Sequence, residues 1–230
     1  QLMKIKFLIP VTADYSEKKQ DLLDYLTPLI SENTELVFQQ ITKGFPSVEN
    51  ELQGMFNGCY VTDNVLNDKT FFDGVYVNCF DDPGVYACRE TSKIPVIGPY
   101  QAALHTALTL SERVGIITTD RAGILNEERK SRQIGFSGNI AAIDCVDFKV
   151  SDIGSEKAAL TQKLFALCCD FVQNHRVTAI CLGCTAMFYV VDDLRQHLQN
   201  AGMFVNIIEP VSNGVLFLEN IIRLGYKNHI

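Results

Sequence analysis

Short apolar runs alternate with longer segments of helical periodicity along the whole chain. Each apolar run has the length of one strand, and turn-forming residues separate it from the next element. The predicted strands are Lys4–Ile9, Glu35–Ile41, Gly74–Cys79, Pro95–Gly98, Val114–Thr118, Asn139–Val146, Val177–Leu182 and Phe204–Ile208. Strands that alternate with helices are typical of βαβ units, so the pattern predicts an α/β fold with parallel sheets.

Helix signals fill the segments between these strands. Ser155 is a candidate N-cap for a helix whose apolar residues recur at helical spacing. Those residues are Leu160, Leu164, Cys168 and Phe171. Gly202 is a candidate terminator for the helix that contains Leu194 and Leu198.

Two stretches of the chain echo each other. Leu8–Asp14 and Ile116–Asp120 each end an apolar strand with threonine and aspartate, and farther along each half an apolar strand leads to Cys79 or to Cys184. The echo predicts two similar lobes. We assign residues 1–98 with 209–230 to the first and residues 99–208 to the second. Each cysteine then lies at the carboxyl end of a strand, where open α/β sheets bind ligands.

Composition excludes several classes of protein. The chain has 230 residues, of which 47% are hydrophobic and 20% charged, so it is neither a disordered chain nor a coiled coil. Its net charge is −7, and its largest positive cluster, Arg129, Lys130 and Arg132, follows two glutamates and is typical of a solvated helix face. We therefore expect no nucleic-acid partner.

The sequence also argues against a membrane or secreted protein. No apolar run reaches the roughly 18 residues that a membrane span needs. The opening residues QLMKIKFLIP are too short for a secretion signal. We expect a cytoplasmic protein with no membrane partner, in which the eight cysteines are thiols rather than disulfides.

Two of these cysteines stand in a context that favours chemistry. Cys79 precedes Asp82-Pro83, a pair typical of a helix N-cap and first helical residue, and Cys184 precedes Thr185, another candidate N-cap. A thiol at the positive end of a helix is favoured as thiolate, and the same backbone N–H groups can hold an oxyanion. The alternative interpretation is that both are buried cysteines at strand ends.

The remaining cysteines and the histidines carry no such signal. Cys181 and Cys184 form a C-x-x-C, but Cys181 lies inside an apolar strand and no second ligand pair exists for zinc. His105 lies in an apolar helical run. Nucleotide, zinc-protease and serine-hydrolase signatures are missing. The cysteines that we interpret as core or helix residues are Cys59, Cys88, Cys145, Cys168 and Cys169.

Several segments resemble, in order, those of hydantoin and allantoin racemases. Asn78–Glu90 resembles their C-F-G-D-P-G…A-R-E segment, and Leu182–Met187 resembles L-G-C-A-G-M. Val114–Thr119 matches their central strand and double threonine, Gly44–Glu49 resembles G-P-x-S-I-E, and Ala102–His105 resembles A-A-M-H. The order holds along nearly the whole chain, so the sequence is similar to the cofactor-independent aspartate/glutamate/hydantoin racemase superfamily.

This resemblance implies a fold and a mechanism. The fold is two pseudo-symmetric α/β lobes, each with a parallel sheet flanked by helices, and an active-site cleft between them. The implied catalytic residues are Cys79 and Cys184, with no cofactor and no metal. One cysteine as thiolate removes a proton from carbon, and the other as thiol delivers one to the opposite face. Superfamily members that lack one cysteine can catalyse decarboxylation, so the presence of both favours racemisation.

The sequence also departs from the hydantoin branch. Ile9-Pro10-Val11-Thr12 stands where that branch usually has N-P-N-T, and Asp81 stands where it has glycine. Thr185 follows Cys184 as in the G-C-T-H segment of aspartate and glutamate racemases, but Ala186 replaces the histidine. The substrate therefore stays open between the two branches.

Chemistry favours a 5-substituted hydantoin or a related ureide as the small-molecule substrate. The C5 proton lies beside an amide-type carbonyl that can take up the enolate charge, whereas an amino acid would place that charge on a carboxylate. The cations nearest to the cysteine motifs in sequence are Arg89 and Arg121. Candidates for binding the substrate, each of which could instead serve a turn or cap, are Thr12, Asn78, Phe80, Thr118, Thr119 and Thr185. Whether Glu209 or His105 contributes to the site stays open.

Other functions stay open as alternatives. They are an aspartate/glutamate-type amino-acid racemase, a cis–trans isomerase of an unsaturated diacid, and a non-catalytic small-molecule binding module. Because members of the superfamily commonly assemble, we also expect a homo-oligomer.

Overall fold

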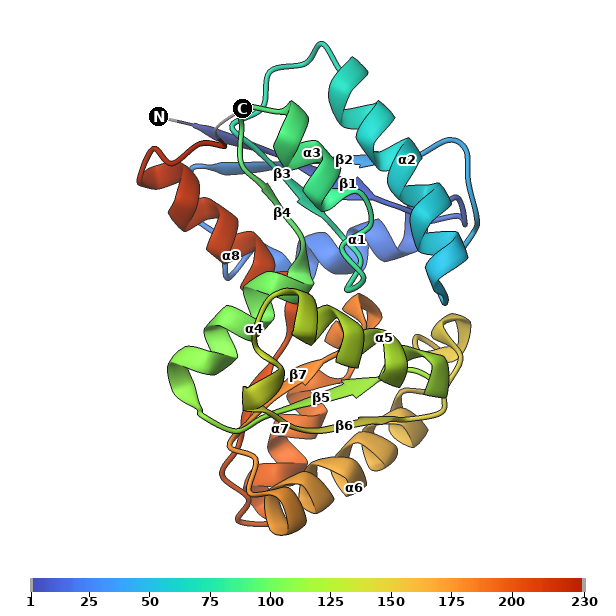
Figure 1. Ribbon diagram of the computed structural model, residues 1–230, viewed down its shortest axis with the longest axis vertical. Coiled ribbons are helices and arrows are strands. Elements are labelled where there is room, and N and C mark those ends of the chain that lie inside the picture. Colours follow the sequence, from blue (N-terminus) through green and yellow to red (C-terminus); the bar gives the residue numbers. More distant parts are fainter. Residues whose placement is uncertain (1, 229–230) are drawn as a thin grey trace. The chain divides into compact units, whose positions relative to one another are not determined.

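The computed structural model describes residues 2–228, and the chain folds as two compact units (Figure 1). Unit 1 consists of Gln1–Ala102 and Val211–Ile230, and unit 2 of Ala103–Pro210. The sequence placed the corresponding boundaries after residues 98 and 208. Each unit contains a four-stranded parallel sheet flanked by helices, which confirms the predicted α/β fold class.

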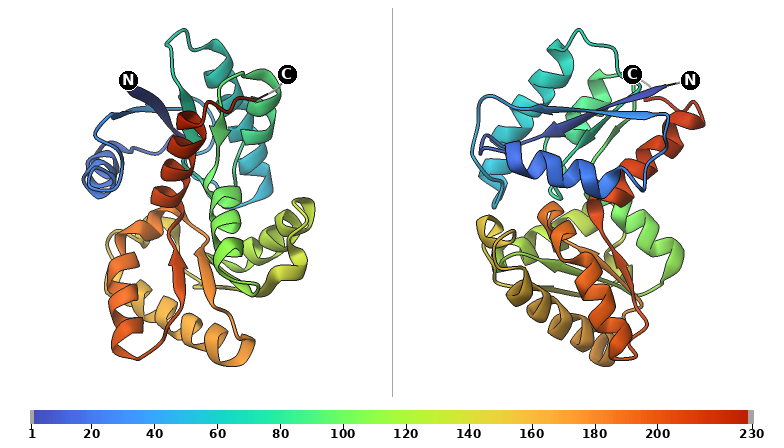
Figure 2. Two further views of the ribbon diagram at one scale, coloured as in Figure 1. Left: turned by 90° about the vertical axis from the view of Figure 1, so that its left-hand side faces the viewer. Right: turned by 180° about the vertical axis from the view of Figure 1, so that it is seen from behind.

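The sheet of unit 1 has the strand order β2-β1-β3-β4. Its strands are β1 (Met3–Ile9), β2 (Thr34–Gln40), β3 (Gly74–Val77) and β4 (Val96–Ile97). Its helices are α1 (Ser16–Leu26), α2 (Glu51–Asn67), α3 (Val85–Thr91) and α8 (Pro210–Arg223). Helices α2 and α3 cover one face of the sheet, and α1 and α8 cover the other (Figure 2).

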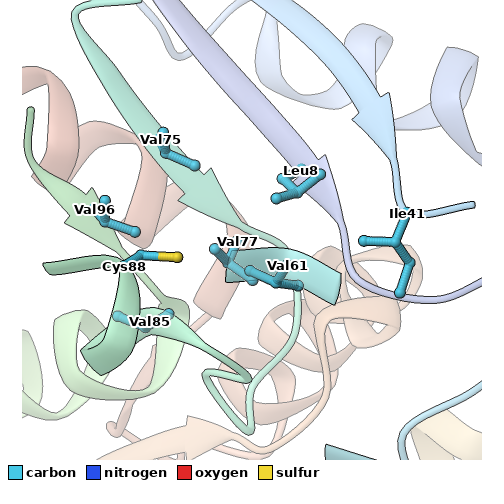
Figure 3. Close-up of a cluster of buried hydrophobic side chains, with 8 residues drawn as sticks. All are labelled: Leu8, Ile41, Val61, Val75, Val77, Val85, Cys88 and Val96. Carbon is cyan, nitrogen blue, oxygen red and sulfur yellow. The ribbon is translucent and has the colours of Figure 1, made fainter. Parts of the chain in front are cut away.

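Apolar side chains fill the space between this sheet and α2 and α3 (Figure 3). Leu8, Val75 and Val77 come from the central strands and pack against Val61 of α2 and Val85 of α3. All of them are buried, as expected for parallel strands covered on both faces.

One of the two lysines of β1 is buried in the interior. Lys6 is 1% exposed, and its amine lies 2.7 Å from a carboxylate oxygen of Asp68 and donates to Asn64 Oδ1 at 2.9 Å. Burial alone would raise the pKa of Asp68, but hydrogen bonds from Lys6, Thr70 and Gln39 outweigh it and hold that pKa well below its usual range. The buried ammonium is therefore paired, which is the condition for tolerating it in the interior.

Unit 2 repeats the architecture with the strand order β6-β5-β7-β8. Its strands are β5 (Val114–Thr118), β6 (Ile140–Cys145), β7 (Ala179–Leu182) and β8 (Asn206–Ile208). Its helices are most of α4 (Pro99–Leu110), α5 (Arg121–Gln133), α6 (Lys157–His175) and α7 (Val191–Asn200), with 3₁₀ turns η1 (Ser137–Asn139), η2 (Val150–Asp152) and η3 (Thr185–Tyr189). Asp120 caps α5 by accepting from the Gly123 N–H at 2.8 Å.

The two units are internal repeats. Adding four to each strand number of the first sheet gives the strand order of the second, so β1 corresponds to β5 and β3 to β7. The last helix of each repeat changes unit, because α8 follows β8 but belongs to unit 1, and most of α4 follows β4 but belongs to unit 2. The sequence echo between Leu8–Asp14 and Ile116–Asp120 thus has a counterpart in the strand order.

All eight predicted strands are present; Val114–Thr118 has the predicted bounds, and the ends of the others agree to within two residues. The predicted apolar face of α6 is buried, and Gly202 ends α7 in the left-handed region with φ +68°. The Ser155 cap was wrong, because α6 begins at Lys157 after Glu156 and the Ser155 hydroxyl donates to the Asp152 carbonyl. The basic cluster of α5 is not wholly solvated, since Lys130 forms a 2.9 Å ion pair with the buried Glu127.

Residues 2–228 contain no helix that combines the length and the apolar character required to cross a membrane.

We expect Lys6→Met to lower the free energy of unfolding by about 2 to 4 kcal/mol, because it leaves the Asp68 carboxylate partly buried without its cation. The double variant Lys6→Met/Asp68→Leu should regain most of this loss. Asp192→Ala, which removes an exposed ion pair with Arg195, is the control and should change stability by less than about 1 kcal/mol. Urea unfolding measures all three, and a double variant no more stable than Lys6→Met would contradict the pairing.

The same ion pair predicts a pH dependence. The folded-state pKa of Asp68 is lowered, so its contribution to stability is complete above the unfolded-state pKa of about 4 and is lost as the pH falls through the folded value. Unfolding curves recorded below pH 4 should therefore show a smaller difference between the wild type and Asp68→Asn than curves at pH 7. An unchanged difference would exclude this linkage.

Candidate active site

The first candidate cysteine lies directly after β3 in unit 1. Val77 pairs with Leu8 of β1, and the next N–H, that of Asn78, donates to the Leu8 carbonyl at 2.9 Å. The Cys79 N–H then donates to the Val77 carbonyl at 2.9 Å, a three-residue turn centred on Asn78. Cys79 is half-buried at the carboxyl edge of the sheet, as the sequence predicted for ligand-binding positions.

The predicted cap after Cys79 was wrong. Helix α3 begins only at Val85, and its N-cap position is Gly84 in the left-handed region with φ +75°. Asp82 also has a positive φ, +49°, and its carboxylate accepts from the Tyr100 N–H at 3.1 Å and the Gln101 N–H at 3.4 Å. The carboxylate therefore serves the first turn of α4 instead of α3. Cys79 therefore lies five residues before the N-cap position of α3 and outside its first turn, so the expectation of a helix start directly beside the thiol is not met.

The loop that follows Cys79 is held in place on two sides. The Phe80 ring is buried and packs edge-on against the Tyr100 ring, with centroids 5.3 Å apart. On the other side, Gly84 lies against Gly58 of α2, where a Cβ on Gly84 would come within 2.5 Å of the Gly58 carbonyl oxygen. Together with Asp82, these contacts give the loop a fixed backbone path.

The second candidate cysteine follows β7 in unit 2 at the equivalent register. Leu182 pairs with Ile117 of β5, and the Gly183 N–H donates to the Ile117 carbonyl at 2.7 Å. Cys184 is half-buried and comes next, as Cys79 does after Asn78. Only glycine fits before it, because a Cβ on Gly183 would lie 2.9 Å from both the Ile117 oxygen and Thr118 Cα.

The predicted cap after Cys184 was also wrong. Residues Thr185–Tyr189 form the 3₁₀ turn η3, with Cys184 itself in the N-cap position, and α7 begins at Val191. Thr185 is therefore the first residue of a short 3₁₀ turn rather than the cap of α7. The helix-dipole argument for a thiolate is correspondingly weak at this site too.

The threonines predicted to bind substrate lie in different environments. Thr118 is buried, and its side chain packs against Gly123 and Gly183. Thr119 is half-buried, and its carbonyl accepts from the Phe148 N–H at 2.9 Å. Unit 2 thus brings Thr118 and Thr119 to the same sheet edge as Cys184 and Thr185.

Thr12 belongs to the equivalent edge of unit 1. Its N–H donates to the Phe45 carbonyl at 3.1 Å, and its hydroxyl lies 3.4 Å from the Gly44 carbonyl. Asn78 and Phe80 flank Cys79 in the same unit and are both buried. Of the two residues left open by the sequence, His105 packs edge-on against Phe136 in unit 2, and Glu209 is buried directly before α8.

One residue at this edge carried no signal in the sequence analysis. Tyr15, just before α1, accepts a hydrogen bond from Asn78 Nδ2 at 3.0 Å through its hydroxyl. Tyr15 also lines a surface cavity of about 210 Å³ that includes Ile9, Ser16 and Lys19. Its polar contact spans 63 residues of sequence, which no local pattern reveals.

Of the remaining cysteines, Cys88, Cys168 and Cys181 are buried, Cys145 and Cys169 are half-buried, and Cys59 on α2 is exposed. Burial raises the pKa of the Cys88, Cys145 and Cys169 thiols and raises that of Cys168 to about 12. Cys181 is fully buried, and burial together with the negative charge of Glu127 raises its pKa strongly. These thiols are therefore poorly suited to form thiolates, in agreement with their interpretation as packing residues.

The cation nearest to Cys79 in sequence is committed elsewhere. Arg89 Nε donates to the Val96 carbonyl at 2.8 Å, and Nη1 donates to Gln101 Oε1 at 2.7 Å. Its guanidinium thus ties α3 to β4 and α4. Within residues 2–228, no three side chains of the His, Cys, Asp or Glu type are grouped so that they could hold a metal ion.

Comparison with known sequences gives one family. The sequence model of the Asp/Glu/Hydantoin racemase family matches residues 20–217. A hydantoin racemase of Rhizobium meliloti is 29% identical over 154 residues, which are 67% of this chain and 62% of that protein. A hydantoin racemase of Paenarthrobacter aurescens is 29% identical over 160 residues, which are 67% of this chain and 64% of that protein. The match spans less than two thirds of these curated relatives.

Solved structures share the fold over nearly the whole chain. An allantoin racemase from Klebsiella pneumoniae has a TM-score of 0.88 at 24% identity, covering 99% of this chain and 90% of that one. A glutamate racemase from Bacillus anthracis has a TM-score of 0.60 at 14% identity, covering 97% of this chain and 82% of that one. At these identities the likeness establishes the fold.

We expect thiol labelling to separate the cysteines by environment. In the native protein, Cys88, Cys168 and Cys181 should react with N-ethylmaleimide at least about a hundredfold more slowly than the exposed Cys59, because their burial must first be undone. In urea all should react alike. Peptide mapping by mass spectrometry after timed quenching gives the rates, and rapid native labelling of Cys181 would contradict the described burial.

Proposed function

This chain belongs to the Asp/Glu/hydantoin racemase family, and we propose on that basis that it is a cofactor-independent racemase, an isomerase that uses Cys79 and Cys184 as its acid–base pair. The observation that carries this proposal is the equivalence of the two cysteines. Each follows the third strand of its repeat by two residues, at the carboxyl edge where α/β sheets bind ligands. No other pair of cysteines occupies matching positions in the two repeats as described.

In the proposed reaction, a thiolate removes the proton from the stereogenic carbon. The electron pair of the C–H bond moves into the adjacent carbonyl and forms an enolate. The thiol of the other cysteine then delivers a proton to the opposite face, which leaves the first cysteine as thiol and the second as thiolate. A cysteine pKa of about 8.5 makes both forms accessible near neutral pH, and the roles reverse with the opposite enantiomer.

We propose a 5-substituted hydantoin or a related ureide as the substrate. The names of the sequence relatives support this choice, since two of them are hydantoin racemases. The commitment of Arg89 to Val96 and Gln101 also supports it, because an amino-acid substrate would need a cation for its carboxylate. An amide-type carbonyl needs only hydrogen-bond donors for its enolate.

The proposed substrate-binding residues flank the two cysteines. They are Thr12, Asn78, Phe80, Thr118, Thr119 and Thr185. Because Phe80 and Thr118 are buried by contacts within their own units, we assign them the task of holding the cysteine loops. The others are at least partly accessible or carry a polar group at the sheet edge.

We expect Cys79→Ser and Cys184→Ser each to lower kcat for racemisation by at least about a thousandfold, because a serine hydroxyl is a far weaker base than a thiolate. Polarimetry with 5-benzylhydantoin measures this loss. Each single variant should still exchange the C5 proton of one enantiomer in D₂O, since one base survives, and proton NMR detects that exchange. The double variant should be silent.

Cys181→Ser is the matched control, since Cys181 lies in β7 three residues before Cys184 and is fully buried. It should retain racemisation wherever the variant folds. A Cys79→Ser/Cys184→Ser protein with wild-type activity would overturn the assignment. Exchange on aspartate or glutamate alone would indicate an amino-acid racemase, turnover of maleate a cis–trans isomerase, and binding without exchange a binding module.

We also propose that the protein is cytoplasmic and assembles as a homo-oligomer. The oligomer is supported by an apolar stripe on α2, where Leu52, Met55, Phe56 and Cys59 follow helical spacing and are exposed. Contiguous exposed apolar side chains of this kind are typical of surfaces that a second copy covers.

The oligomer predicts a particle heavier than the 25.7 kDa chain in size-exclusion chromatography with light scattering. Phe56→Lys should shift that mass toward one chain, because it places a charge within the apolar contact. Leu125→Lys, at a single exposed leucine on α5, is the control and should leave the mass unchanged. A wild-type mass of 25.7 kDa would exclude the proposal.

A further inference from the structure

Asn78 has one half of its amide bonded and the other half unsatisfied. Nδ2 donates to the Tyr15 hydroxyl at 3.0 Å, whereas Oδ1 is buried and has no hydrogen-bond partner among the described residues. The whole residue is 5% exposed. Buried polar atoms in native proteins are nearly always paired, so an orphaned acceptor beside a candidate catalytic cysteine indicates a missing donor.

Two residues of β3 that precede this amide face α8. Gly74 faces α8, since a Cβ there would lie 2.8 Å from Ile222 and 2.9 Å from Leu218. Tyr76 faces the same helix one turn earlier, where its ring would lie 2.5 Å from a Cβ on Gly214. Asn78 follows the end of β3, and its Nδ2 reaches the Tyr15 hydroxyl directly before α1, a helix that covers the same face of the sheet as α8 (Figure 2).

The turn before the cysteine does not itself require an amide. In unit 2 the equivalent position is Gly183, which makes the same backbone hydrogen bond to the neighbouring central strand. A side chain has no room there, whereas unit 1 leaves space for asparagine and pairs half of it with Tyr15. The side-chain amide before the cysteine is thus present only in unit 1, and the backbone arrangement that the two units share does not require it.

We infer that Asn78 Oδ1 accepts a hydrogen bond from a ring N–H of the substrate, with Tyr15 as the residue that positions the amide. This inference rests on the proposed racemase function and names the substrate class more closely. A neutral, buried acceptor suits a neutral N–H, because a buried ammonium group would call for a carboxylate partner. Asp82, four residues after Asn78, and Asp14, next to Tyr15, both accept hydrogen bonds from backbone N–H groups. The substrate is therefore a cyclic ureide whose ring N–H lies near the reacting C–H.

The test compares the loss of an acceptor on the protein with the loss of a donor on the substrate. The substrates are 5-benzylhydantoin and its 1-methyl and 3-methyl derivatives, each of which lacks one N–H. The proteins are the wild type, Asn78→Leu and Asn78→Asp, with Asn67→Leu on the exposed end of α2 as the matched control. C5–H exchange in D₂O gives kcat/KM, and calorimetry gives the affinity.

We expect Asn78→Leu to lower kcat/KM for 5-benzylhydantoin by about tenfold to a hundredfold, the effect of one buried hydrogen bond. One of the two N-methyl substrates should show a similar loss with the wild type and little further loss with Asn78→Leu. Asn78→Asp keeps an acceptor and should stay within about tenfold of the wild type. Asn78→Leu should change the urea midpoint little, since the gain from removing the unsatisfied Oδ1 offsets the lost bond from Nδ2 to Tyr15, whereas replacing a purely structural asparagine would lower it.

Tyr15→Phe tests the positioning role. It should lower kcat/KM in the wild-type background and have no further effect in Asn78→Leu, because its effect passes through the amide. Equal effects in both backgrounds would remove Tyr15 from the inference.

The outcomes separate this inference from the racemase proposal. Exchange with additive effects of Asn78→Leu and N-methylation would overturn the inference and leave the racemase standing. Without exchange, hydantoin binding that weakens tenfold in Asn78→Leu would support the inference and refute the racemase. A wild type that neither exchanges nor binds hydantoins would refute both.

Discussion

The parallel register of β3 on β1, and of β7 on β5, is the constraint on which the candidate site depends. In each repeat, the N–H of the residue after the third strand donates to the carbonyl of the first strand, and the cysteine comes next. Because side chains alternate along a strand, a slip of one residue would move each cysteine off the sheet edge and reverse the buried faces. The apolar packing of Leu8, Val75 and Val77 against α2 and α3 opposes such a slip. The core of the unit and the placement of its thiol are therefore set by the same contacts.

The two repeats share this strand register but differ in the residues that follow each cysteine. In the first repeat, Asp82 lies three residues after Cys79, and its carboxylate accepts hydrogen bonds from N–H groups at the start of α4. The carboxylate lies so close to Gly98 that a Cβ on that residue would collide with it. In the second repeat, the position three residues after Cys184 is occupied by the buried Met187, which has no carboxylate. Gly98 directly precedes Pro99, the first residue of α4, and its counterpart before Pro210 of α8 is the buried Glu209. A buried carboxylate is thus present near the start of the last helix in both repeats, but it comes from a different element. The polar surroundings of the two cysteines therefore differ, although the strand orders match.

The sequence was sufficient for the strands, the strand-end positions of Cys79 and Cys184, and the packing role of Cys181, because these follow from local apolar patterns. It failed at the helix starts after both cysteines. Asp82-Pro83 reads locally as a cap, but a positive φ at Asp82 and Gly84 delays α3, and α4 captures the carboxylate from 18 residues away. The Asn78–Tyr15 bond was invisible for the same reason, since it joins residues 63 apart. Polar contacts between distant elements decide the detail of the site, and single-sequence patterns do not encode them.

These findings change the source of reactivity that the cysteines would use. Neither cysteine lies at the start of a regular α-helix, so the thiolate does not depend on a helix dipole. Both candidates are half-buried, whereas Cys168 and Cys181 are buried and have raised pKa values. The exchange of roles in the proposed racemisation would be served by two thiols that are each both acid and base, since a strongly stabilised thiolate would be a poor acid in the reverse direction. In the proposed site, the polar groups of the substrate would be bound by neutral hydrogen-bonding groups such as the Asn78 amide, and these match the cyclic ureide that we propose better than a carboxylate.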